Sequence, residues 1–377
     1  MNKLRFIGLD VHAQSIAVAV AEPSGEVRSI GTIPNCPESV SRLIHKLGQP
    51  ERLRACYEAG PMGYVLYWQL TELGVQCDVI APTLIPVKAG DRVKTDRRDA
   101  MKLARCHRAG DLTPVWVPDA AHEALRDLVR ARLAGKRDQL RARNRLGKFL
   151  LRQGRRAPAQ LRNWNSAHLA WIRALRFEQL AQQLTVEDYL HEVEHHSERI
   201  ARLELSIDAA IAQLPQKMRC VIQALQSLRG IAQVSAVSIM AELGEVSRFT
   251  QARQLMGYSG VVSWEHSSGG RVHRGGISKA GNAHLRRIVV EAAWCYRHRP
   301  ALGKALGVRQ RSCPAHINEM AWKAQHRLHR RYQQLIGRGK CKQQVVVAVA
   351  RELLGFIWAI GTHTERDHPL EQLRRAA

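Results

Sequence analysis

The sequence predicts an α/β domain at the N-terminus and a mostly helical remainder. Three β-prone segments come first, at 6–11, 16–21 and 27–33, and helical and strand patterns then alternate up to residue 108. Strands followed by such alternation are typical of a mixed sheet flanked by helices. A chain of 377 residues is long enough for two or three domains, each with its own core.

The elements of the first domain follow from local pattern. A Pro23-Ser24-Gly25 turn separates the second and third strands. The elements expected after these strands are a helix at 38–47, a strand at 53–57, a helix at 63–73, a strand at 75–80 and a helix at 96–108. We place the domain at residues 1–115.

Four acids occupy positions that a catalytic site would need. Asp10 lies on the first predicted strand and Glu58 at the end of the fourth, while Asp96 and Asp99 share one face of the last helix. If that helix packs across the sheet, the four carboxylates converge. Such a cluster is stabilised by Mg²⁺, or by Mn²⁺, held between carboxylates and substrate phosphate. Each acid taken alone is also compatible with a solvated charge or a turn residue.

A second group of chemically suggestive residues lies between Tyr258 and Arg287. Ser267 and Ser268 precede Gly269-Gly270, where the missing Cβ lets backbone approach a ligand closely. We expect a helix to begin at Ser278. A serine hydroxyl here could attack phosphorus, although a basic, flexible surface loop is the alternative interpretation. The residues of this stretch that suit phosphate binding are Arg271, Arg274, Lys279, Arg286 and Arg287.

Both groups together resemble the DEDD insertion-sequence transposases, over most of residues 1–300. The motifs that carry the resemblance are G-L-D-V (8–11), Y-E-A-G-P-M-G-Y (57–64), K-T-D-R-R-D-A-M-K-L-A (94–104) and S-S-G-G-R-V-H-R-G-G-I-S-K-A-G-N-A-H-L-R-R (267–287). The resemblance implies a RuvC-like, RNase H-fold domain. It also implies metal carboxylates at Asp10, Glu58, Asp96 and Asp99, and a nucleophile at Ser268 with Ser267 as its nearest competitor.

The resemblance further implies an RNA-guided DNA recombinase. Such an enzyme cleaves and rejoins donor and target double-stranded DNA through a covalent phosphoserine intermediate, under an element-encoded guide RNA, as a homo-oligomer (dimer or tetramer). Two alternatives stay open. A RuvC-like junction resolvase or nuclease would hydrolyse DNA with two metal ions and form no adduct. A non-catalytic nucleic-acid-binding scaffold would bind DNA and cleave nothing.

The positive charge is concentrated in two segments. The net charge is +25, and residues 1–115 carry 15 Lys/Arg against 12 Asp/Glu, residues 116–157 carry 12 against 4, and residues 297–342 carry 12 against 1. This distribution predicts discrete surfaces for a polyanion. We assign Arg141, Arg145, Arg327 and Arg330 to nucleic-acid contact. Aromatic residues near the last pair, such as Trp322, suit stacking on RNA bases, whereas solvated helix faces are the alternative.

The middle of the chain, residues 116–225, is predicted to be helical. A basic helix should run to about Arg152, and Trp164 and Trp171 mark a second helix. Apolar residues from Val193 to Leu214 alternate threes and fours, which predicts either a coiled-coil seam for self-association or an amphipathic helix packed within the chain. The H-E-x-x-H pattern at 191–195 lacks the context of a zinc site.

Residues 226–300 should form the serine domain, and residues 301–377 a basic helical C-terminal extension. Leu228 to Leu243 resembles a helix-hairpin-helix, but Arg229-Gly230-Ile231-Ala232 lacks the proline and second glycine of the family's turn. Eight cysteines without metal-ligand spacing, no signal peptide, and an apolar run at 345–360 broken by Arg351-Glu352 predict a soluble intracellular protein with no membrane partner. The resemblance to the transposases implies the bacterial cytosol and association with the nucleoid.

Overall fold

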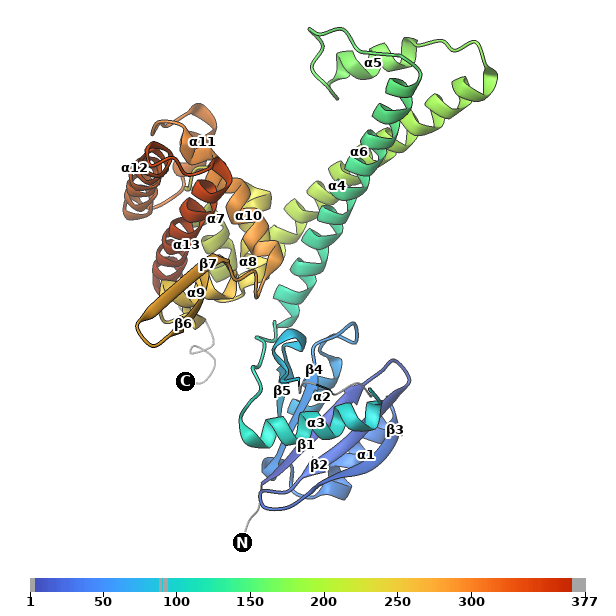
Figure 1. Ribbon diagram of the computed structural model, residues 1–377, viewed down its shortest axis with the longest axis vertical. Coiled ribbons are helices and arrows are strands. Elements are labelled where there is room, and N and C mark those ends of the chain that lie inside the picture. The colour runs from blue at the N-terminus through green and yellow to red at the C-terminus, as the bar shows by residue number, and fades with distance from the viewer. Residues whose placement is uncertain (1–3, 88–89, 91–93, 368–377) are drawn as a thin grey trace. The chain divides into compact units, whose positions relative to one another are not determined.

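The computed structural model describes residues 4–87, 90 and 94–367. Contacts divide the chain into two compact units, Met1–Val117 and Pro118–Ala377 (Figure 1). The first boundary lies two residues beyond the predicted one, whereas the three segments predicted after residue 115 belong to a single unit.

The first unit is built on a five-stranded mixed sheet of order β3-β2-β1-β4-β5. β2 pairs antiparallel with β1 and β3, and β4 pairs parallel with β1 and β5. This arrangement is consistent with the RNase H-like fold that the resemblance implies. The elements are β1 (Arg5–Val11), β2 (Ser15–Ala21), β3 (Val27–Pro34), α1 (Pro37–Leu47), η1 (Pro50–Arg52), β4 (Leu53–Glu58), α2 (Val65–Glu72), β5 (Gln76–Ile80), η2 (Pro82–Leu84) and α3 (Asp96–Ala109).

Strand alternation gives the two faces of this sheet different side chains. On one face, large residues such as Ile7, Leu9 and Val18 pack with α1 and α2. The other face carries small residues, among them Gly8 and Ala19, and α3 lies on it through Ala100 and Ala104. Small residues on both surfaces let the helix approach the strands closely.

The second unit begins with a long helical hairpin. α4 (Ala120–Arg152) and α6 (Leu180–Gln213) pack along their lengths, with α5 (Ser166–Ala174) between them in sequence (Figure 1). Val193, Ile200 and Ile207 of the predicted seam are buried. Gly135 of α4 lies against Ile200, so the seam packs within the chain, as the amphipathic-helix alternative predicts.

The rest of this unit shares one hydrophobic core, which also includes Leu125 of α4 and Ile207 of α6. Residues on both sides of position 300 contribute, for example Leu285 and Leu353, so the chain beyond residue 300 is part of this domain. The elements are α7 (Gln216–Leu225), α8 (Gln233–Leu243), η3 (Val246–Arg248), α9 (Ala252–Tyr258), β6 (Ser263–Ser268), β7 (Arg271–Ile277), α10 (Ala283–Ala293), η4 (Trp294–Arg297), α11 (Lys304–Gln310), α12 (Ala315–Gly337) and α13 (Lys342–Asp367).

The structure of the serine stretch differs from the sequence analysis in two ways. First, the stretch is not a flexible loop but an antiparallel β-hairpin, β6–β7, within an otherwise helical domain. The second difference is the start of the following helix. α10 begins at Ala283 with Asn282 as its N-cap, because the backbone N–H groups of Ser278 and Lys279 donate to Val262 and Gly260 at the base of the hairpin. A helix beginning at Ser278 is therefore wrong.

α13 is long and apolar enough to cross a membrane by length and composition. In this fold, Val345, Val349, Leu353 and Ile357 of α13 are fully buried in the core of the second unit. α13 packs against α7, α10 and α12, so its apolar character is explained by its position as a central core helix.

Candidate active site

Asp10, Asp96 and Asp99 meet where α3 crosses β1. Asp10 and Gly8 lie on the same face of β1. A Cβ added to Gly8 would lie only 2.2 Å from the Ala100 carbonyl oxygen and 2.4 Å from the Ala104 nitrogen. Only glycine permits this approach. Thr95 caps the start of α3 by accepting from the Arg98 backbone N–H, which places Asp96 and Asp99 in the first turn.

His12 joins this cluster, and the sequence analysis missed it. Its Nε2 lies 3.3 Å from Asp10 Oδ2 and 3.5 Å from Asp96 Oδ1. The position, two residues after Asp10 at the end of β1, is the signal that could have found it, because alternate residues of a strand share a face.

The negative charge of the Asp10 carboxylate is destabilised by its surroundings when no cation is bound. Burial raises the pKa of this carboxyl, and the neighbouring Asp96 and Asp99 raise it further, although His12 opposes the shift. The Asp10 side chain is 17% exposed, whereas that of Asp96 is 64% exposed, so the cluster opens to solvent. A half-buried carboxylate beside two others is typical of a site arranged for positive charge.

The donor set suits a hard divalent cation. One ligand atom each from Asp10, His12 and Asp96 lie within 4.8 Å of one another. Carboxylate oxygens favour Mg²⁺ or Mn²⁺, and one imidazole is compatible with Mn²⁺. The residues present therefore fit the metal that the resemblance implies.

Glu58 reaches the same region from β4. It lies two residues after Cys56, which packs with Leu103 of α3, so Glu58 also belongs to the α3 face. Glu58 and Asp99 line one cavity of about 250 Å³, together with Lys94 and Lys102. The Lys94 ammonium is 3.9 Å from Asp99. All four predicted acids thus lie around the junction of β1, β4 and α3.

Ser268 ends β6 on an exposed ribbon in the second unit. It pairs with Arg271 across a two-residue turn in which Gly269 has a φ of +58°. Glycine with a positive φ at the first central position is the feature of a type II′ hairpin turn. The turn therefore explains Gly269-Gly270 structurally, and it presents Ser268 at the tip of the ribbon.

Ser267 has a different environment from Ser268, because neighbouring strand residues face opposite sides. Its hydroxyl donates to Glu265 Oε1 at 2.8 Å, and Arg274 Nε donates to Glu265 Oε2 at 2.7 Å. Hydrogen bonds from Arg274 and Ser267 lower the pKa of Glu265. A carboxylate paired with arginine is a weak base, so this arrangement does not favour Ser267 as the nucleophile.

The N-terminus of α10, the helix that follows the hairpin, is anchored on a buried carboxylate. Glu242 of α8 accepts two hydrogen bonds from Arg130 of α4, both at 2.9 Å, and one from the Asn282 amide at 2.8 Å. Burial would raise the pKa of Glu242, but these hydrogen bonds outweigh it and lower the pKa. The network ties α4, α8 and the N-terminus of α10 together below the ribbon.

Several predicted nucleic-acid residues have partners within the protein. Arg274 donates a hydrogen bond to Glu265, and Arg286 donates one to the Ser259 carbonyl. The other paired residues are Arg141 with Asp138, Arg145 with Glu192, Arg287 with Glu291 and Arg327 with Glu352. The exposed predicted residues include Arg271 and Lys279 on or beside the ribbon, and Arg330 on α12. Trp322, also on α12, is 44% exposed.

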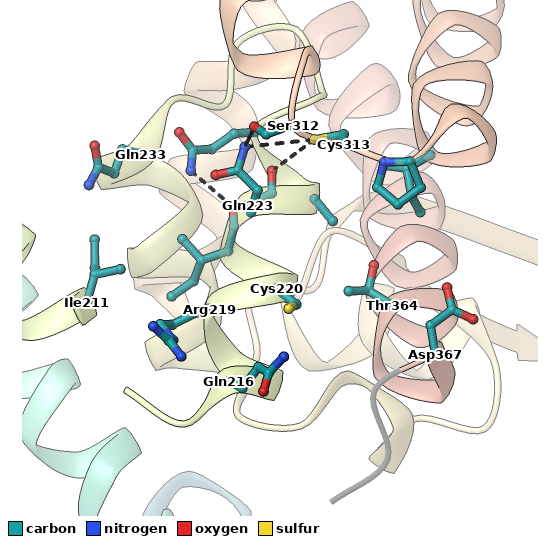
Figure 2. Close-up of a pocket in the computed structure, with 15 residues that line it drawn as sticks. Ile211, Gln216, Arg219, Cys220, Gln223, Gln233, Ser312, Cys313, Thr364 and Asp367 are labelled. Carbon is teal, nitrogen blue, oxygen red and sulfur yellow. Dashed lines mark hydrogen bonds between the residues drawn. The ribbon is translucent and has the colours of Figure 1, made fainter. Parts of the chain in front are cut away.

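Two other candidate sites lack the chemistry of an active centre. In the H-E-x-x-H segment, Glu192 and Glu194 pair with Arg145 and Arg173, and Val193 is buried. A cavity of about 590 Å³ beside α7 contains Cys313 and Gln223 (Figure 2). Burial raises the pKa of the Cys313 thiol, whose Sγ donates to the Gln223 carbonyl, so this thiol is a poor nucleophile.

Comparisons with known proteins show the family to which this chain belongs. Residues 7–153 match a DEDD transposase model of the IS110 type, and residues 222–306 match the model described as Transposase IS116/IS110/IS902 family. The chain is 43% identical to y4qE of Sinorhizobium fredii, which is named as a transposase, over 94% of this chain and 88% of that protein.

Two further relatives extend the comparison. The chain is 31% identical to the transposase for insertion sequence element IS1533 of Leptospira borgpetersenii, over 89% of this chain and 97% of that protein. It is 24% identical to the pilin gene-inverting protein of Moraxella bovis, over 72% of this chain and 67% of that protein.

The mixed sheet with its acidic cluster and the matched models define a DEDD transposase, an enzyme that acts on DNA. Within that class, the chain belongs to the IS110/IS116/IS902 family of insertion-sequence transposases.

Proposed function

We propose that this transposase cleaves and rejoins DNA through a covalent phosphoserine intermediate. Asp10, Glu58, Asp96 and Asp99 would form the metal-binding half of the site, and Ser268 the nucleophilic half. The observation that carries the proposal is the seating of α3 on β1 at Gly8, which gathers acids far apart in sequence at one junction.

The carboxylates and the serine have separate roles. A divalent cation bound by Asp10 and Asp96 would supply Lewis-acid polarisation of the scissile phosphate. His12, by pairing with Asp10 and Asp96, orients these two carboxylates. Lys94 and Lys102 line the cavity of Glu58 and Asp99, where their ammonium groups attract the phosphodiester.

The chemical step conserves the phosphodiester energy. The Ser268 Oγ attacks phosphorus as its proton is lost, the Oγ–P bond forms, and the P–O3′ bond breaks as the leaving oxygen gains a proton. A 3′-hydroxyl on the exchanged strand then attacks the phosphoserine in reverse and releases Ser268. The similarity to the pilin gene-inverting protein supports rejoining over simple hydrolysis, because inversion of a gene requires both cleavage and joining.

The partners follow from the same proposal. Donor and target double-stranded DNA would be selected by an element-encoded guide RNA, and the exposed basic residues of the ribbon and α12 supply phosphate contacts. We propose a homo-oligomer in the bacterial cytosol, associated with the nucleoid.

A comparison of serine variants tests the nucleophile. Protein purified from cells that carry the gene with its native flanking DNA is assayed with Mg²⁺ for protein–DNA adduct, and co-purifying RNA is sequenced. We expect Ser268→Ala to reduce the adduct by at least about a thousandfold, since no other group can replace a nucleophile. Ser267→Ala is the matched control and should retain it.

The other outcomes identify the alternatives. An undiminished adduct in Ser268→Ala overturns the assignment. Cleavage that never yields an adduct indicates the junction resolvase or nuclease, and binding without cleavage indicates the scaffold. A single structured RNA encoded beside the gene supports guided recombination, whereas random cellular RNA counts against it.

A further inference from the structure

The outer side of α3 carries a basic groove, and Lys102 alone of its basic residues has a role in the chemistry proposed above. The groove has a volume of about 1020 Å³ and lies on the same unit as the acidic cluster. Its charged lining consists of Arg97, Arg98, Lys102 and Arg105, with Asp111 as the single acid.

Helical spacing explains how these residues form one surface. Ala100, Leu103 and Ala104 are the buried residues of α3 and face the sheet. Arg98, Lys102 and Arg105 follow one another at i, i+4 and i+7 and therefore share a different face. Asp96 and Asp99 lie at the first turn of the same helix, so a single element carries the acids and the basic face.

Three basic residues of this groove, Arg97, Lys102 and Arg105, are available to a ligand. Arg97 and Arg105 are exposed, and within the described part of the chain neither of them, nor Lys102, forms an ion pair. Arg108, one turn beyond Arg105, is already engaged within the protein, because its guanidinium donates hydrogen bonds to the backbone carbonyls of Glu22 and Gly25.

The groove leads to the acidic site through one residue. Lys102 lines the groove and also the cavity that Glu58 and Asp99 line. From Arg97 to Arg105 the helix rises by about 12 Å, at about 1.5 Å per residue. That length matches about three to four nucleotides of one DNA strand, at about 3.4 Å each.

We propose that this groove binds the phosphodiester backbone of about three to four nucleotides of the DNA strand that enters the carboxylate site, on one side of the scissile phosphate. The proposal rests on the proposed function for the identity of that strand. The groove counteracts the repulsion between phosphates and the carboxylates, and it fixes the register of the strand relative to Asp99 and Glu58.

The test is a pair of charge-matched double variants of the full chain. Arg97→Gln/Arg105→Gln removes two charges from the groove, and Arg42→Gln/Lys46→Gln removes two exposed charges from α1, on the opposite face of the sheet. Both are made in an Asp10→Asn background, so that no cleavage occurs. Binding of a fluorescent 20-base-pair DNA duplex is measured by anisotropy across a salt series, with an RNA duplex in parallel.

We expect the groove variant to lower DNA affinity about tenfold at 0.15 M salt and to make the slope of log K against log salt shallower by about 1.8, because each phosphate contact contributes about 0.9. The α1 variant should leave both values unchanged. Equal losses in the two variants, or no loss in the groove variant, overturn the proposal. A loss confined to RNA also overturns it and assigns the groove to RNA.

This experiment separates the groove from the chemistry. If the active protein forms no Ser268 adduct but the groove variant still weakens DNA binding, the proposed function fails and the groove stands. If the adduct forms and the groove variant binds DNA normally, the groove proposal fails and the proposed function stands. Circular dichroism of both variants verifies that neither has unfolded.

Discussion

At the scale of single residues, the acidic cluster shows that the arrangement of the site lowers the stability of the fold. Asp10 is partly buried beside Asp96 and Asp99, and its pKa is raised. A raised pKa means that the folded state binds the proton more tightly than the unfolded chain. Ionisation of Asp10 at neutral pH therefore subtracts stability, and this deficit disappears as the pH falls below the unfolded pKa of about 3.9.

Asp10→Asn tests this reasoning by thermal unfolding. Without divalent cations at pH 7, the melting temperature of the first unit should rise by about a few degrees, because a repelled charge is removed. With Mg²⁺ or Mn²⁺ at about 100 times the dissociation constant, the wild type should gain about 2.7 kcal/mol and the variant much less. Equal metal stabilisation of both proteins would contradict the assignment of Asp10 as a ligand.

At the scale of elements, the contact of α3 with β1 decides the geometry of the site. The helix lies directly on the strand because Gly8, Ala100 and Ala104 are small. The β6–β7 ribbon depends on a similar contact: a Cβ on Gly260 would lie 2.0 Å from the Ala280 carbonyl oxygen. In both places, a glycine lets a polar functional segment rest against backbone.

Gly8→Ala should therefore separate α3 from β1. The added methyl meets two backbone atoms that cannot move independently, so we expect a loss of about 1–3 kcal/mol in unfolding free energy. Adduct formation should fall at least tenfold, since Asp96 and Asp99 move with the helix. Calorimetry and the adduct assay measure the two effects.

Gly147→Ala on α4 is the control for this substitution. No atom lies within 4 Å of its added Cβ, so stability should stay constant or rise by about 0.5–1 kcal/mol from helix propensity. A stable, active Gly8→Ala protein would show that the close contact is dispensable.

At the scale of the whole molecule, the two halves of the proposed site belong to different compact units. The carboxylates lie in the first unit, residues 1–117, and Ser268 lies in the second, residues 118–377. Under the proposed function both halves act on one phosphate, and they are contributed either by the two units of one chain or by units of two chains.

Co-expression of two inactive variants distinguishes these arrangements. Asp10→Asn and Ser268→Ala chains carry different affinity tags, and mixed oligomers are purified through both tags. If the site is shared between subunits of a dimer, one of the two sites of a mixed dimer is intact, so the purified mixed dimers should give about half of the wild-type adduct, all on the Asp10→Asn chain. The resemblance to the family favours this outcome, and an absence of adduct in mixed oligomers points to closure within one chain.

The sequence by itself determined the elements of the first unit and the acids they carry. Each predicted strand and helix there ends within a few residues of the observed one, because strand alternation and helical spacing are local properties of the chain. The motif spacing also placed Asp10, Glu58, Asp96 and Asp99 on elements that meet in the fold. Comparison over about nine tenths of the chain then supports the family that these motifs predict.

Only the tertiary structure decided what each side chain contacts. It showed that His12 joins the acids, that Arg145 and Arg327 are paired with glutamates, and that the seam of α6 packs on α4. It also showed a β-ribbon where a loop was expected. The physical reason is that burial, charge pairing and strand pairing depend on partners distant in the sequence, and no local pattern specifies which partner will be adjacent.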